Sequence, residues 1–169
     1  MLWDGLGGLT QLAPAPGVCH ANVPAHCEVF PYLFNNSLLP TALDEKATAA
    51  NLYAQLNDTV VSAILPHVPD PATAAVLRGS LEAGVLVSRA VLLGWTIMAE
   101  GYSGDRSGVY NRTAIAAAIH EYDATWVSYR QLPARYPGLG IMSDAHWSHA
   151  STGVPGMGAS VDRYRHLDS

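Results

Sequence analysis

The sequence predicts a mainly α-helical protein in which a three-helix, bundle-like core lies between an irregular N-terminal arm and a loop-rich tail. Apolar residues recur at three- and four-residue steps in three long segments, each segment begins near a capping residue, and prolines stand at or beyond the segment ends. A chain of 169 residues suffices for one domain with a buried core. We therefore expect an arm over residues 1–40, a helical core over 41–137 and a tail over 138–169.

The arm holds five of the eleven prolines and few apolar runs, which is typical of loops and turns. A strand over residues 27–34 would be confined to a sheet edge by Pro31. Cys19 and Cys27 are close enough in sequence to form a disulfide in an oxidising compartment. Two unrelated thiols are the alternative, whereas a zinc site with the adjacent His20 and His26 is disfavoured by its ligand spacing.

The first core helix is expected over residues 41–65, with Thr41 as its cap and Pro66 beyond its end. Four apolar positions are predicted to share one face: Tyr53, Leu56, Val60 and Ile64.

The second helix is expected over residues 70–100, because Asp70 is a good cap and a proline follows at the first helical position. Its C-terminal half has almost no polar face, which indicates a central, buried helix. The glycines are interpreted as points of close helix approach: Gly79, Gly84 and Gly94. Glu82 and Arg89 on this helix are each expected to have a polar partner inside the bundle, and a structural ion pair is favoured over catalysis.

The glycines and serines of residues 101–110 predict a loop, and Asn111 or Thr113 then caps a third helix that is expected to end near residue 132. Its apolar positions form one regular stripe: Ile115, Ala118, Ile119, Tyr122, Trp126 and Tyr129. The aromatic members can be interpreted as a sugar-stacking platform, but their helical spacing favours core packing. A short helix is expected over residues 159–166.

Charged residues make up only 14% of the chain, and this scarcity predicts that part of the surface is covered by a partner or by the rest of a longer chain. The net charge of −5, without a basic cluster, argues against nucleic acid. Arg89 lies within the most apolar stretch, residues 83–99, which argues against a membrane span there.

Three glycosylation sequons, at Asn35, Asn57 and Asn111, predict a secretory-pathway protein, either extracellular or lysosomal. No signal sequence follows Met1, so we expect the chain to be a piece of a longer precursor.

Four aromatic residues in segments predicted as loops are candidates for ligand contact: Trp3, Tyr102, Tyr110 and Trp147. His146 and His149, close to Asp144, are further candidates, and they form either a polar loop or part of a metal site whose remaining ligands the sequence does not name. No nucleotide, phosphate or hydrolase motif is present, so no cofactor and no catalytic residue are predicted.

The last third of the chain resembles the C-terminal helical region that follows the barrel in some glycoside-hydrolase-like proteins. The resemblance depends on two short motifs: Tyr122-Asp123-x-x-Trp126-x-x-Tyr129 and Pro155-Gly156-Met157-Gly158-x-x-Val161-Asp162-x-Tyr164. It implies a helical appendage that packs against a catalytic barrel and borders its substrate cleft. The catalytic carboxylates of such enzymes would lie in the barrel, so no catalytic residue is carried over.

The sequence therefore predicts a noncatalytic helical domain of a secreted or lysosomal carbohydrate-active enzyme, partnered by the rest of that chain and bordering a carbohydrate. The alternative is an autonomous helical module that binds another protein or self-associates. A third hypothesis, a small metalloenzyme, depends on His146 and His149.

Overall fold

The computed structural model describes residues 37–141 and 161–168, and every regular element within these ranges is helical. The long helices are α3 (Leu39–Ala63), α4 (Pro71–Ser107) and α5 (Arg112–Arg130). The short elements are η2 (Leu65–His67), α6 (Leu132–Arg135) and η3 (Arg165–Leu167). The predicted mainly α-helical class with a three-helix core is confirmed, while the strand proposed over residues 27–34 lies outside the described residues.

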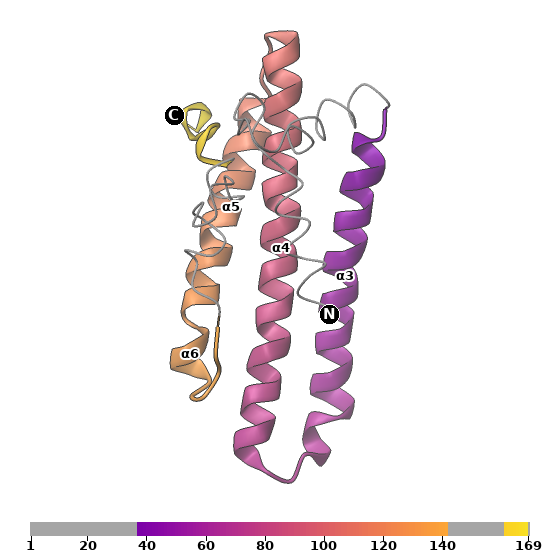
Figure 1. Cartoon of the computed structure of the whole chain (residues 1–169), viewed down its shortest axis with the longest axis vertical. Coiled ribbons are helices and arrows are strands. Elements are labelled where there is room, and N and C mark those ends of the chain that lie inside the picture. The colour runs from indigo at the N-terminus through magenta and orange to yellow at the C-terminus, as the bar shows by residue number, and fades with distance from the viewer. Residues whose placement is uncertain (1–36, 142–160, 169) are drawn as a thin grey trace, which may run out of the picture.

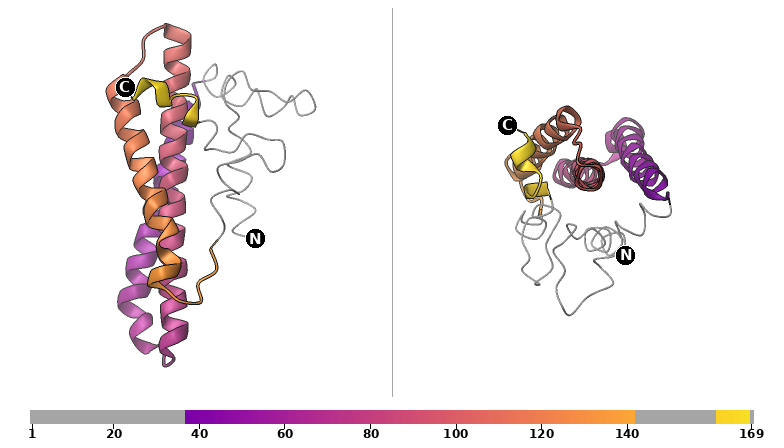
Figure 2. Two further views of the ribbon diagram at one scale, coloured as in Figure 1. Left: turned by 90° about the vertical axis from the view of Figure 1, so that its left-hand side faces the viewer. Right: turned by 90° about the horizontal axis from the view of Figure 1, so that it is seen from above.

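Helix α4 is the central helix of the bundle and lies between α3 and α5 (Figure 1). It packs along α3 on one side and along α5 on the other, and α3 and α5 make no comparable contact with each other in the described residues (Figure 2). With 37 residues it is about 55 Å long at the usual helical rise. The fold is therefore a row of helices with α4 in the middle.

Helix α3 begins at Leu39, and no side chain caps its first turn. The prediction that Thr41 caps this helix was wrong. Pro40 lies in the first turn, where a missing amide is harmless and the backbone angle already suits a helix, so the helix starts before Thr41.

Only part of the predicted face of α3 is in contact with α4. Val60 is buried, and the ring of Tyr53 lies on Gly84, where a Cβ would be 3.2 Å from ring atoms. Leu56 and Ile64 are instead each 49% exposed. Alternating steps of four and three residues from Tyr53 to Val60 pass through Asn57 rather than Leu56, which explains why that leucine is left outside.

Helix α4 starts as predicted, with the Asp70 carboxylate accepting hydrogen bonds from the amides of Ala72 at 3.3 Å and Thr73 at 2.9 Å. It does not end near residue 100. The helix continues to Ser107 and ends at Gly108, whose φ of 74° is the left-handed conformation that favours glycine. The predicted loop over residues 101–110 was therefore wrong for most of its length.

Glycines in α4 mark the places where other segments approach closely. At four of them the ring of a tyrosine occupies the space that a Cβ would need: Tyr136 on Gly79, Tyr53 on Gly84, Tyr164 on Gly101 and Tyr110 on Gly104. The interpretation of Gly79 and Gly84 as contact points is confirmed, and Gly94 is buried. The same use explains why Gly101 and Gly104 lie inside a helix rather than in a turn.

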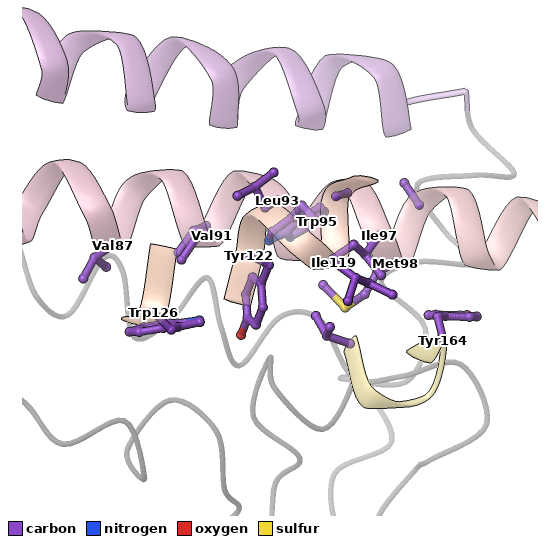
Figure 3. Packing of buried hydrophobic residues seen from close by; sticks show 14 of the residues in the cluster. Val87, Val91, Leu93, Trp95, Ile97, Met98, Ile119, Tyr122, Trp126 and Tyr164 are labelled. Atoms are coloured by element: carbon purple, nitrogen blue, oxygen red, sulfur yellow. The ribbon is translucent and has the colours of Figure 1, made fainter. Parts of the chain in front are cut away.

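The core of the bundle surrounds the C-terminal half of α4. Residues 93–95 and 97–99 are all buried, so the burial is not confined to one stripe of this helix (Figure 3). A helix packed on two sides needs apolar residues around most of its circumference. An 18-residue window of α4 has a mean hydropathy of 1.5, enough by length and composition to cross a membrane, and 56% of that window is buried inside the structure. The buried central helix of a folded protein meets the same test.

Helix α5 agrees closely with its prediction. Asn111 caps it by accepting a hydrogen bond from the amide of Ala114 at 3.3 Å. All members of the predicted stripe are buried, and Trp126 packs edge-on against Tyr122 at 6.0 Å and Tyr129 at 5.3 Å between ring centroids. The interpretation of these aromatic residues as core is confirmed.

Replacing Gly101 tests the close approach of Tyr164. We expect Gly101→Ala to lower the free energy of unfolding by about 1–2 kcal/mol, because overpacking by the new methyl group outweighs the better helix propensity of alanine. In a Tyr164→Ala background the same change should instead raise it by about 1 kcal/mol. Urea unfolding of the four variants measures both effects, and equal effects in the two backgrounds would contradict the contact.

Candidate functional site

Several residues predicted from the sequence lie outside the described residues: Trp3, Cys19, Cys27, Asn35, His146, Trp147 and His149. The disulfide therefore stays a prediction, and the alternative of a metal site at His146 and His149 is untested. Within residues 37–141 and 161–168, no group of three or more His, Cys, Asp or Glu side chains converges as metal ligands would.

The two tyrosines of residues 101–110 that were predicted to contact a ligand both pack against other parts of the protein. Tyr102 belongs to α4 and is 6% exposed, so its prediction as a loop residue available to a ligand was wrong. Tyr110 lies in the connection to α5, where its ring packs on Gly104 and its hydroxyl donates to Asp105 Oδ1 at 2.5 Å. That hydrogen bond is the main cause that raises the pKa of Tyr110.

The two described sequon asparagines differ in their surroundings. Asn111 is exposed at the start of α5, and its Oδ1 serves as the cap. Asn57 is half-buried in the middle of α3, and its Nδ2 donates to Asp58 Oδ1 at 3.3 Å. Asn111 is therefore the more accessible of the two to a glycan.

The C-terminal segment, residues 161–168, packs against α4 and α5. Val161, Tyr164 and Leu167 recur at three-residue steps and are all buried. The carboxylate of Asp105 holds this segment, because its Oδ2 accepts from the Tyr164 hydroxyl and from Arg163 Nη2, both at 3.0 Å. Burial, followed by the charge of Asp105, raises the pKa of Tyr164 far above its usual range.

A second set of polar contacts joins the same segment to α5. Arg165 donates to both oxygens of Asp123, from Nη1 at 2.7 Å and from Nη2 at 2.8 Å, and its Nε donates to Asp162 at 2.6 Å. Such a two-pronged arginine–carboxylate pair fixes orientation as well as distance. Nε2 of His120 lies 3.0 Å from Asp168 Oδ1, close to the end of the segment.

The charged residues that the sequence singled out on α4 have partners on other elements. Arg135 Nη1 lies 2.6 Å from Glu82 Oε1, and the Tyr136 hydroxyl donates to Glu82 Oε2 at 2.8 Å. Arg89 pairs with Glu121 of α5 on the surface. The expectation of structural ion pairs is confirmed, but the pair of Arg89 with Glu121 lies at the surface rather than inside the bundle.

These contacts assign a positioning role to the carboxylates that they involve. Glu82, Asp105, Glu121 and Asp123 each hold an arginine or a tyrosine from another element. These ion pairs join elements to one another. Within the described residues, these polar clusters therefore connect separate segments of the fold.

A strip of apolar residues on α3 is exposed. Leu52 is 58% exposed and Leu56 is 49% exposed, and Ala49 and Ala63 are exposed on the same side of the helix. We call these four residues the α3 flank. They lie beside the face that contacts α4, whereas the opposite face of α3 carries mainly polar side chains.

Comparison of the chain with family models, with curated proteins and with solved structures found no match in any of the three. The resemblance of the last third to glycoside-hydrolase-like proteins therefore remains a prediction from its two motifs.

The buried Tyr122 predicts a loss of stability at alkaline pH. Burial is the main cause that raises its pKa from 10.0 to about 12, so the unfolded chain loses this proton at lower pH than the folded chain. The contribution is present below pH 10 and is lost as the pH rises toward 12. We expect the free energy of unfolding to fall more steeply over this interval in the wild type than in Tyr122→Phe, as measured by urea unfolding.

Tyr164, whose pKa is also raised, makes the free energy of unfolding fall with pH in both the wild type and Tyr122→Phe. The difference between the two pH profiles therefore reports Tyr122 alone. Parallel pH profiles for wild type and Tyr122→Phe would show that the Tyr122 hydroxyl titrates normally in the folded protein.

Proposed function

We propose that this chain is a noncatalytic helical domain that packs against the rest of a larger, secreted or lysosomal carbohydrate-active protein. The observation that carries the proposal is the α3 flank. Helix α3 has 25 residues but only two buried ones, Leu39 and Val60, while Leu52 and Leu56 are exposed beside its contact face. An apolar strip on an incompletely buried helix is typical of a surface that another protein layer covers.

Two further features support packing rather than catalysis. Charged residues make up 14% of the chain, fewer than a fully wetted surface usually carries. The polar clusters around Asp105, Asp123 and Glu82 fasten segments to the bundle. Within this proposal α4 is an interior helix, enclosed by α3, α5 and the covering layer, and not a membrane span.

The carbohydrate-active parent is proposed from the resemblance of the last third, and the secretory compartment from the sequons. The exposed position of Asn111 suits a glycan. A transcript that continues upstream of Met1 into a catalytic barrel would support the parent protein, and an in-frame stop directly before Met1 in every transcript would contradict it.

An autonomous interaction module is the second candidate, and a specific observation favours it. The C-terminal segment closes over α4 and α5 with buried side chains and with ion pairs at Asp105 and Asp123, so this half of the domain makes a complete set of its own contacts. On this alternative the α3 flank binds a separate protein or a second copy. A cooperative thermal transition of the isolated full chain favours the module, and a broad one with loosely packed side chains favours a domain that needs its parent.

Charged substitutions on the α3 flank test whether it is a docking surface. We expect the full chain to self-associate at high concentration through this strip, and Leu52→Glu with Leu56→Glu to make it monomeric in sedimentation experiments. The free energy of unfolding should change by only about 0.5 kcal/mol, because both leucines are exposed.

The control is Val127→Glu, which places one glutamate on an exposed valine of α5. It should sediment like the wild type. If the double variant unfolds, or if Val127→Glu has the same effect on association, the flank is not a docking surface.

A further inference from the structure

A cavity of about 360 Å³ lies at the end of the bundle where α3 turns through η2 into α4. Val61, Leu65 and Pro66 line it from the side of α3 and η2, and Ala74 and Ala75 of α4 form an apolar floor. Its volume is at the lower end of the range for small-molecule pockets. The cavity therefore has room for a small ligand with an apolar body.

The wall of the cavity opposite α3 carries polar side chains that are held in place by contacts with α4. Tyr136 and Arg135 line it, and α6 lies across α4 from α3 (Figure 1). The ring of Tyr136 packs on Gly79, its hydroxyl donates to Glu82, and the Arg135 guanidinium lies 5.7 Å above the ring. Glu82 thus fixes both side chains before any ligand arrives.

Arg78 gives the cavity an excess of positive charge. It lines the cavity from α4, and no carboxylate of the described residues lies within ion-pair distance of it. Glu82 balances Arg135, so among the described residues one positive charge remains, that of the exposed Arg78. Partial burial and then Glu82 raise the pKa of Tyr136, and the charges of Arg135 and Arg78 oppose that rise.

We propose that this cavity binds a small monocarboxylate with an apolar body, such as a medium-chain fatty acid. Guanidinium groups recognise carboxylates through paired, charge-assisted hydrogen bonds, and Arg78 is the group that Glu82 leaves unneutralised. The apolar floor then encloses the hydrocarbon part. This site is separate from the α3 flank, so it does not depend on the proposed packing function.

Titration of the full-length chain with octanoate tests the proposal, with octanol as an uncharged probe that has the same hydrocarbon chain. We expect saturable binding of octanoate in calorimetry and at least tenfold weaker binding of octanol. Arg78→Gln should weaken octanoate binding about tenfold, which corresponds to the loss of one charge-assisted contact. It should leave octanol binding unchanged.

Arg112→Gln is the matched control, because Arg112 is an exposed arginine on α5, an element that does not line the cavity. It should bind octanoate like the wild type. A second variant, Ala75→Leu, fills the floor and should abolish binding of both probes, and circular dichroism checks that it is folded.

Absence of saturable octanoate binding would overturn the proposal. Equal affinity for octanoate and octanol would show that the cavity selects no charge, and equal losses in Arg78→Gln and Arg112→Gln would show general electrostatic attraction. Either result also rejects the assignment.

Discussion

The structure depends on the close approach of four segments to one long helix. Each of them places a tyrosine ring on a glycine of α4: α3 at Gly84, the end of α6 at Gly79, the α4–α5 connection at Gly104 and the C-terminal segment at Gly101. Each glycine weakens an isolated helix by about 1 kcal/mol relative to alanine. The helical state of α4 therefore depends on the contacts that these segments make with it. The hydroxyls of three of these tyrosines then reach a carboxylate of α4, which makes each contact directional.

Among the described residues, the two sides of α4 are covered unequally. On the α5 side, aromatic rings fill the core, and Asp105 and Asp123 hold the C-terminal segment with arginines and a tyrosine. On the α3 side, the ammonium of Lys46 lies 5.2 Å above the ring of Trp95 and its pKa is lowered mainly by burial. A half-buried lysine over an aromatic ring is a weaker attachment than a two-pronged arginine–carboxylate pair.

The sequence predicted the fold class and most of α5 because those features depend on local periodicity. Ile119 and Trp126 lie on one regular stripe, and Asn111 caps the helix that follows. The C-terminal end of α4 was mispredicted because Gly101 and Gly104 look like turn residues until the rings that pack on them, those of Tyr164 and Tyr110, are known. The polar clusters around Asp105 and Asp123 were missed for a similar reason, since 58 residues separate Asp105 from Arg163. The three-residue spacing of the buried C-terminal residues was the one hint that this segment docks.

The unequal covering of α4 also explains where a partner would act. The α5 side already has its directional contacts, so a further layer there would have to displace ion pairs such as Arg165 with Asp123. On α3, the exposed Leu52 and Leu56 lie beside a contact face whose middle position is the polar Asn57. Covering the flank would remove apolar surface from water at about 25 cal/mol per Å² without breaking any of the inter-element ion pairs described above. The free-energy gain from docking is therefore greatest where the bundle itself is least complete.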